Sequence, residues 1–195
     1  MQLQKLFLAV SATVVIGGCA STYDAPASDI PSAKIVMEKG YEDGLGIGKS
    51  SVAVYAVQTS DTCKIHKQDG LARMTWISGA VTEKSVEAGE PITLLANITK
   101  YDSLSGGGYW NGYGYSVNMI TTIPCLSRVS FIPEAGKTYR FTQREVDKNV
   151  CEVDFADAAT NLVPADAVVE NEVFCKEDVM MPPGTTAADI EAAGS

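Results

Sequence analysis

The chain has 195 residues and a formal net charge of −9, from 15 Lys and Arg against 24 Asp and Glu. This length suits a single domain with a hydrophobic core of its own. The acidic balance argues against binding to nucleic acid and against extra attraction to anionic lipid, because both need Lys and Arg gathered on one face.

The first eighteen residues have the pattern of a secretory signal peptide. Lys5 supplies a positive charge, an apolar run extends from residue 6 to residue 16, and two glycines precede Cys19. A run of about 11 apolar residues is too short to span a bilayer, and no later stretch approaches the roughly 20 residues that a spanning helix needs. An ordinary cleaved signal that lies near a cysteine by chance is the alternative.

The tetrad Ile16-Gly17-Gly18-Cys19 resembles the lipobox of bacterial lipoproteins, in which an aliphatic residue and two small ones precede a lipid-modified cysteine. The resemblance implies a mature chain that begins at Cys19 and carries acyl chains, palmitate among them. Two or three such chains hold a protein stably on a membrane, whereas one chain binds reversibly. By analogy with enterobacterial lipoprotein sorting, Ala20 and Ser21 imply the outer membrane, with the domain facing the periplasm.

Composition divides the rest of the chain into three parts. Residues 19–33 are rich in Ser, Thr, Asp, Pro and Ala, which predicts a lipidated flexible tether. Residues 34–176 carry the apolar patterns of a folded domain. Residues 177–195 contain Met-Met-Pro-Pro-Gly followed by small and polar residues, and we expect a disordered tail there.

Eight short runs of β-branched and aromatic residues fill the central part, separated by Gly, Pro, Asp and Asn. They are residues 51–57, 71–78, 92–101, 115–121, 127–132, 138–146, 150–157 and 167–174. Such runs predict an all-β fold, a single antiparallel β-sandwich of about seven or eight strands. No long window in this part has an apolar stripe with the 3.6-residue period of a helix.

The sequence Glu-Ala-Gly marks two turns, at residues 87–89 and 134–136. Gly is expected in both because it adopts positive φ at no steric cost. The second turn, with Pro133, Lys137 and Tyr139 around it, resembles the PxxGKxY turn of many small periplasmic β-sandwich lipoproteins. The match is too short to identify a family.

Four cysteines follow Cys19, namely Cys63, Cys125, Cys151 and Cys175. An even number in an exported chain predicts two disulfides. A zinc site is the weaker alternative, because no two of these cysteines form a CxxC pair and His66 is the only histidine. A hairpin of residues 150–157 with 167–174 would place Cys151 opposite Cys175, which leaves Cys63 to pair with Cys125.

Residues 105–115 form the most unusual segment, with four aromatic residues among glycines: Tyr109, Trp110, Tyr113 and Tyr115. Tyr and Trp on a pliable loop make an adhesive surface for a protein or a glycan. The segment is therefore the candidate partner-binding site. The alternative is a long hairpin loop whose aromatic residues fold back and cap one end of the sandwich.

Other segments offer little chemistry. Residues 43–50 look like a phosphate-binding loop, but Asp43 replaces the first Gly and a predicted strand follows instead of a helix. His66 lies between Lys64 and Lys67, and neighbouring cations do not make the carboxylate-oriented base of a catalytic site. Five acids, Asp154, Asp157, Asp166, Glu170 and Glu172, gather near the last predicted hairpin without the spacing of a calcium loop. We expect no catalytic residue, metal or cofactor.

These observations predict a lipid-anchored cell-envelope protein that acts as a non-catalytic binding or assembly module. Its partners would be the membrane, through the anchor, and an envelope protein or glycan, through the aromatic segment. A passive structural lipoprotein is the first alternative. An enzyme that acts on envelope polymers is the second, and it would need acids that converge in one cleft.

Overall fold

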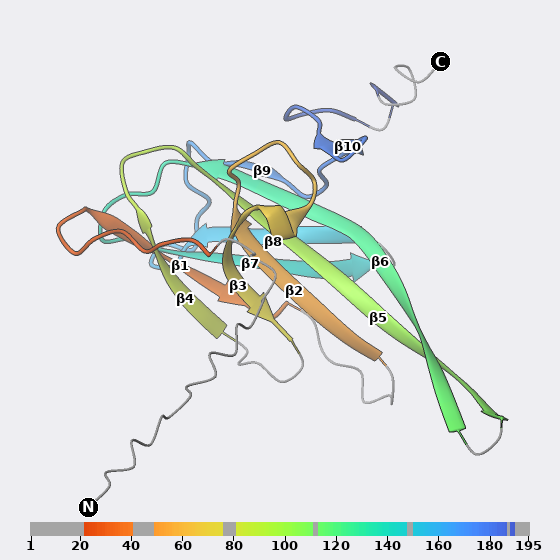
Figure 1. Ribbon diagram of the computed structural model, residues 1–195. Helices are drawn as coiled ribbons and strands as arrows, with labels where there is room; N and C mark the ends of the chain where they lie inside the picture. Colours follow the sequence, from red (N-terminus) through yellow and green to blue (C-terminus); the bar gives the residue numbers. More distant parts are fainter. Residues whose placement is uncertain are drawn as a thin grey trace, which may run out of the picture.

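The computed structural model describes residues 22–40, 49–75, 81–110, 113–147, 150–186, 188 and 189 (Figure 1). Almost all regular structure in these residues is β, as predicted, with one short 3-10 turn, η1 (Ile65–Lys67). The strands are β1 (Ser32–Glu38), β2 (Lys49–Val57), β3 (Asp69–Met74), β4 (Val81–Glu87), β5 (Ile92–Trp110), β6 (Tyr113–Phe131), β7 (Thr138–Asp147), β8 (Val150–Asp157), β9 (Val168–Glu170), β10 (Cys175–Lys176) and β11 (Val179–Met180).

Two sheets make up the sandwich. The first sheet has the strand order β4-β1-β7-β8, and the second has the order β3-β2-β5-β6-β9. Neighbouring strands run antiparallel, as predicted, except that β1 and β7 are parallel, from the pair Lys34 and Thr138 to the pair Met37 and Phe141. Strands β10 and β11 form a separate two-stranded ribbon.

Strand β1 alternates as a half-buried strand should, with Ala33, Ile35 and Met37 buried and the residues between them more exposed. Strand β4 buries only Val86, because it lies at the edge of the first sheet. Neither strand was among the predicted runs. Two predicted runs, residues 115–121 and 127–132, belong to the single long strand β6.

The core lies between the two sheets and is centred on aromatic rings. The ring of Phe131, on β6, is 4.9 Å from the ring of Tyr139 on β7 and 4.7 Å from the ring of Phe155 on β8, both in edge-to-face contact. Phe141 meets Tyr55 from β2 in the same way, at 5.4 Å. Such pairs add about 0.5–1.5 kcal/mol each beyond the area that they bury, so they fix how the sheets face each other.

Polar contacts also join the sheets. The Tyr55 hydroxyl donates to the Glu38 carbonyl at 2.8 Å and accepts from the Gln143 backbone N–H at 3.3 Å. Burial raises the pKa of Tyr55 to about 12, although the hydrogen bond from Gln143 opposes that rise. The buried Gln143 side chain donates to the Cys125 carbonyl at 2.6 Å and to the Ser127 hydroxyl at 2.7 Å. These bonds pair buried polar groups, which would otherwise lose their hydrogen bonds to water without a replacement.

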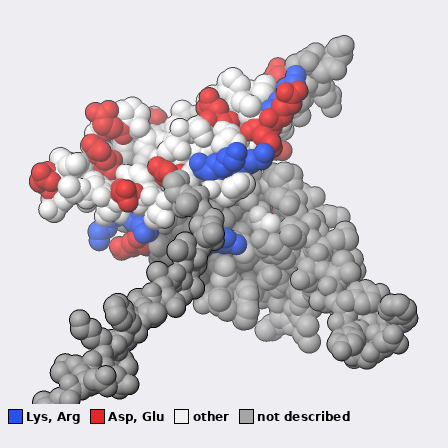
Figure 2. All heavy atoms as spheres, viewed as in Figure 1, with Lys and Arg blue, Asp and Glu red and all other residues white. Residues whose placement is uncertain are grey.

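The two Glu-Ala-Gly turns are present as expected, with φ of +91° at Gly89 and +76° at Gly136. The N–H of Gly89 donates to the Pro133 carbonyl at 2.8 Å, and the N–H of Gly136 donates to the Ser32 carbonyl at 2.8 Å. The turns are therefore joined to each other at one end of the sandwich. Figure 2 shows Asp and Glu side chains gathered over this end.

The two disulfides are present, but their predicted pairing is wrong. Cys63 pairs with Cys175, and Cys125 pairs with Cys151. The expected hairpin does not form: β8 pairs with β7 in the first sheet, whereas β9 pairs with β6 in the second. Cys151 therefore lies over Cys125 in the opposite sheet, and this disulfide joins the two layers.

Both predicted flexible ends need correction. Thr22 forms a β-bridge with Gly70, the N–H of Tyr23 donates to the Gly70 carbonyl at 3.0 Å, and Ser32 begins β1. At the other end, β11 continues the fold past residue 177, and Met180 is buried. Composition missed these contacts because backbone pairing, the Cys63–Cys175 disulfide and a few isolated apolar residues such as Tyr23 and Met180 hold the two segments.

Non-reducing proteolysis followed by mass spectrometry tests the disulfide pairing. We expect peptides that join Cys63 to Cys175 and Cys125 to Cys151; a peptide that joins Cys151 to Cys175 would contradict the fold. Replacing both Cys125 and Cys151 by Ser should lower the free energy of unfolding by about 3 kcal/mol, because the disulfide restricts the unfolded chain. Urea titration measures that loss.

Candidate functional site

Strands β5 and β6 form a hairpin much longer than the sandwich. Each has 19 residues, and they pair from Ile92 and Phe131 to Trp110 and Tyr113. Strand β2 stops pairing with β5 at Asp102, and in the described chain neither β5 nor β6 has another neighbour beyond that point. Figure 1 shows this outer part projecting past the ends of the other strands. We call residues 103–110 and 113–118 the arm.

The register shows which face of the arm continues the core side of the sheet. On β5, Leu94, Ala96 and Ile98 belong to the core. The register shifts between Ile98 and Lys100, where the extra residues are on β6. The alternation along β5 is therefore unbroken, and Leu104 occupies a core-side position like Ile98.

The second register shift lies between Leu104 and Gly108, and there the extra residues are on β5. Strand β6 keeps its alternation, so Val117, opposite Leu104, shares its face with Tyr115 and Tyr113. Trp110, opposite Tyr113, belongs to the same face. By register, five apolar or aromatic residues occupy the core-side positions of the arm: Leu104, Trp110, Tyr113, Tyr115 and Val117.

The opposite face is different in composition. Its register positions hold Ser103, Tyr109, Gly114, Ser116 and Asn118. Three of the four aromatic residues singled out in the sequence thus share the core-side face, and Tyr109 does not. The sequence predicted an irregular loop, whereas the structure places the four on two paired strands, with Asn111 and Gly112 between them outside the described residues.

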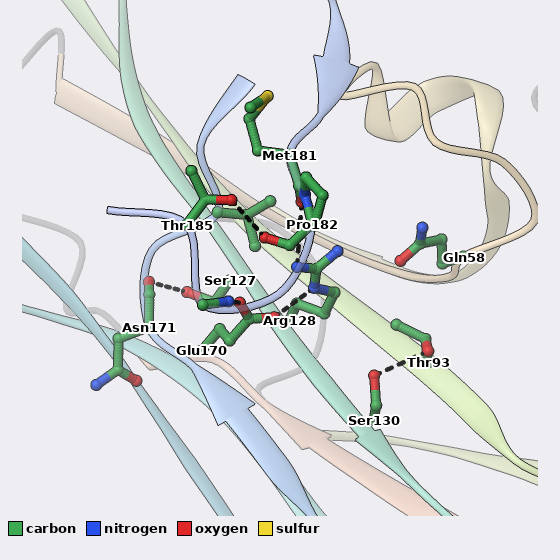
Figure 3. A network of polar contacts seen from close by, with 12 residues as sticks. Gln58, Thr93, Ser127, Arg128, Ser130, Glu170, Asn171, Met181, Pro182 and Thr185 are labelled. Atoms are coloured by element: carbon green, nitrogen blue, oxygen red, sulfur yellow. Dashed lines mark hydrogen bonds and ion pairs between the residues drawn. The ribbon is translucent and has the colours of Figure 1, made fainter. Parts of the chain in front are cut away.

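A second candidate is a polar cleft of about 510 Å³ on the outer side of the second sheet. It lies between the segment after β2, which carries residues 58–61, and Pro183 in the C-terminal segment, with Thr93, Arg128 and Ser130 from β5 and β6 in its wall. Figure 3 shows Arg128 at the centre of this region, with the side chain of Glu170 beside it.

Arg128, the cation in the wall of this cleft, already has hydrogen-bond partners within the protein. The Arg128 side chain is 6% exposed, and its Nε donates to Glu170 Oε2 at 2.5 Å, while Nη2 donates to the Met181 carbonyl at 3.4 Å. Glu170 also accepts the N–H of Gly184 at 3.0 Å. Arg128 therefore ties β9 and the C-terminal segment to β6, which is a structural role. In the sequence, the only indication of this role is a single Arg inside the predicted strand of residues 127–132.

The pKa of Glu170 reflects this pairing. Burial by itself would raise it, but the hydrogen bonds from Arg128 and Gly184, with the positive charge of Arg128, hold the pKa of Glu170 below its ordinary value.

The other acids near the predicted last hairpin do not converge. Asp154 pairs with Arg140 at 3.2 Å and with Arg144 at 2.6 Å. Asp157 accepts the N–H of Ala159, and Asp166 accepts the N–H of Ile132, each from a different turn. Within the described ranges, no group of three or more His, Cys, Asp or Glu is placed to hold a metal ion.

His66 lies in η1 and is exposed. It lines a hollow of about 300 Å³ together with Thr22, Gly70 and Arg73. Cys19 and the rest of the lipobox, like most of the phosphate-loop-like segment 43–50, lie outside the described residues. In the part of the chain that the structure describes, no helix is both long and apolar enough to cross a bilayer.

No protein-family model matches this chain, and no curated protein matches its sequence.

The Arg128–Glu170 pair gives a stability prediction. Glu170→Gln should lower the free energy of unfolding by roughly 2–4 kcal/mol, because it leaves the buried guanidinium without its counter-ion. Since the pKa of Glu170 is lowered in the folded state, its stabilisation is complete above the ordinary pKa of a Glu and is lost as the pH falls through the lower folded value. Urea unfolding at several pH values measures both effects.

The matched control is Glu172→Gln, the same change at an exposed position two residues further along. It should alter stability by less than about 0.5 kcal/mol, as surface substitutions usually do. Equal losses in the two variants would contradict the role of Arg128.

Proposed function

We propose that this chain is a lipid-anchored cell-envelope protein, held on the outer membrane through Cys19 and facing the periplasm, and that it is a non-catalytic binding or assembly module. The arm is its contact surface for an envelope protein or glycan. The observation that carries the proposal is the register of the arm, which gives most of its apolar and aromatic residues one shared side of the β5–β6 ladder, beyond the end of β2.

The proposed anchor at Cys19 and the arm would lie far apart, which suits separate roles in attachment and in binding. Thr22 is bridged to Gly70, which pairs with Ala56, which in turn pairs with Leu95. Cys19 is three residues from Thr22, so the two Cα atoms are at most about 11 Å apart. Trp110 is fifteen residues along β5 from Leu95, or about 45–50 Å at the rise of a strand. The anchor would therefore hold one end of the molecule and the arm would extend from the other.

The anchoring bilayer is a poor occupant for the core-side face. That face is on the side of the second sheet where the first sheet packs, and packed sheets are about 10 Å apart. Laying it flat on lipid would press the first sheet into the bilayer, with Lys34, Arg140 and Arg144 on its outer side. Burying such charges is costly, so a partner in the aqueous space fits better.

An apolar face of this kind is a typical contact surface. Aromatic anchors dominate binding energy at protein interfaces, and each fully buried large side chain contributes about 1.5–3 kcal/mol. An enzyme that acts on envelope polymers is a weaker candidate, because Asp154, Asp157 and Glu170 each pair with a cation in the described chain.

The arm has a matched pair of tests. Replacing Trp110, Tyr113 and Tyr115 together by Ser should reduce partner capture from crosslinked envelopes at least about tenfold, through loss of the core-side face. Tyr109→Ser, on the opposite face, is the control and should retain capture. Thermal unfolding should change little in either variant.

Unchanged capture by the triple variant would favour the passive structural alternative. Capture that falls equally in the triple variant and in Tyr109→Ser would show that the face assignment is wrong.

The anchor has a separate test. Cys19→Ala, in the full chain, should move the protein from the membrane fraction to the soluble periplasmic fraction, because no acyl chain can then be attached. A Cys19→Ala protein that still fractionates with membranes would overturn the lipid anchor while leaving the arm proposal open to its own test.

A further inference from the structure

The two disulfides differ in how far they are open to solvent. Cys125 and Cys151 are buried between the two sheets, with 3% and 7% of their surface exposed. Cys175 is exposed at the start of β10, and its partner Cys63 is half-buried. Thiol–disulfide exchange begins when a thiolate reaches one of the sulfur atoms, so access decides which disulfide reacts. A reductant can therefore reach Cys175 in the folded protein, whereas the disulfide between the sheets is shielded.

The exposed disulfide closes a short flap over the outer side of the second sheet. We call residues 174–180 the flap; they comprise β10, β11 and the turn between them. Met180, in the flap, is buried and packs in one cluster with Leu95 and Leu126 from the central strands β5 and β6. The flap thus covers apolar side chains that would otherwise meet water.

The flap hydrogen-bonds to the loop that follows β2. The N–H of Cys63 donates to the Asp178 carbonyl at 2.8 Å, and the N–H of Met180 donates to the Asp61 carbonyl at 2.6 Å. Lys64 also pairs with Asp178, but both side chains are open to solvent, so this pair adds little stability. Few interactions besides the disulfide therefore hold the flap closed.

The turn of the flap has an unfavourable backbone conformation. Glu177 and Asp178 link β10 to β11, with φ of +52° and +67°. A two-residue hairpin turn with positive φ at both positions suits Asn-Gly, and other residues adopt it at a steric cost. A two-stranded hairpin by itself is also marginally stable at best in water. The flap therefore depends on being tied to the rest of the domain.

The surroundings of the flap are fixed by other contacts. The buried Gln68 side chain holds the loop after β2: its Oε1 accepts the N–H of Thr59 at 2.8 Å, and its Nε2 donates to the Thr62 carbonyl at 2.8 Å. Just before the flap, the N–H of Val173 donates to the Leu126 carbonyl at 2.8 Å. The flap can therefore open while both neighbouring segments stay in place, which keeps the two cysteines close enough to pair again.

We propose that the Cys63–Cys175 disulfide is a redox-sensitive latch, whose reduction opens the flap while the sandwich stays folded. One thiolate of a dithiol reductant attacks the exposed Cys175 sulfur, and the Cys63 thiolate leaves. The second thiolate of the reductant then displaces the Cys175 thiolate. Two electrons and two protons pass to the two cysteines, and the reductant becomes a disulfide. Opening uncovers Leu95 and Leu126, so the redox state decides whether the outer side of β5 and β6 is covered.

Graded reduction of the folded protein with dithiothreitol tests the order of reaction. Free thiols are alkylated at successive times and identified by mass spectrometry. We expect Cys63 and Cys175 to be labelled at least about tenfold faster than Cys125 and Cys151, because exchange follows access to the sulfur atoms.

Hydrogen exchange followed by NMR, in the protein with only the Cys63–Cys175 disulfide reduced, tests the opening. The amides of Cys63 and Met180, which are bonded between the flap and the loop, should exchange at least about tenfold faster, equivalent to about 1.4 kcal/mol. The amide of Val173 should stay protected, because it is bonded to β6 outside the flap.

Matched variants separate the latch from general stability. Cys63→Ser with Cys175→Ser should exchange as the reduced protein does and should not respond to dithiothreitol. Cys125→Ser with Cys151→Ser is the control, and its Met180 amide should stay protected until dithiothreitol is added. Glu177→Asn with Asp178→Gly relieves the turn, so the reduced form should exchange at Met180 at least about threefold more slowly than the reduced natural chain.

Reduction of both disulfides at one rate would overturn the latch. So would equal exchange of the Met180 amide before and after the Cys63–Cys175 disulfide is reduced. Loss of protection throughout β7 and β8 on that reduction would also contradict it, because the disulfide would then hold the whole fold rather than the flap.

Discussion

The β5–β6 ladder is the constraint on which the rest of the structure depends. These two strands are the centre of the second sheet, and their inner sides contribute Leu94, Ile98 and Phe131 to the core. The same hydrogen-bonded ladder continues into the arm without a break in the chain. A contact surface built on paired strands is held more rigidly than one on an open loop, which reduces the entropy lost on binding.

The outer side of this ladder depends on the C-terminal segment. Leu95 and Leu126 face away from the main core and are covered by Val173 and Met180. The Cys63–Cys175 disulfide and the Arg128–Glu170 pair fix that cover at two points. Without it, two large apolar side chains on the central strands would meet water, so the segment after β9 belongs to the domain.

How far the sequence predicts this fold is visible in particular elements. The alternation of apolar residues predicted the bounds of β2, β7 and β8 almost correctly. It failed for β1, whose alternating Ala33, Ile35 and Met37 follow directly on a Pro- and Ser-rich stretch that resembles a linker. The aromatic segment was recognised as unusual, but its division into two faces was not, because the register shifts on β5 and β6 leave no signal in composition. A single Arg inside a predicted strand indicated little of the ion pair that Arg128 makes with Glu170.

The sequence by itself determined the β class, the approximate positions of most strands, the presence of two disulfides and the segment that forms the arm. Those features are local, since period-two alternation records which face of a strand is buried. The tertiary structure alone decided that Cys151 meets Cys125, that Thr22 reaches Gly70, and that Trp110, Tyr113 and Tyr115 share a face. These depend on which strands become neighbours and in what register, and alternation carries no information about either.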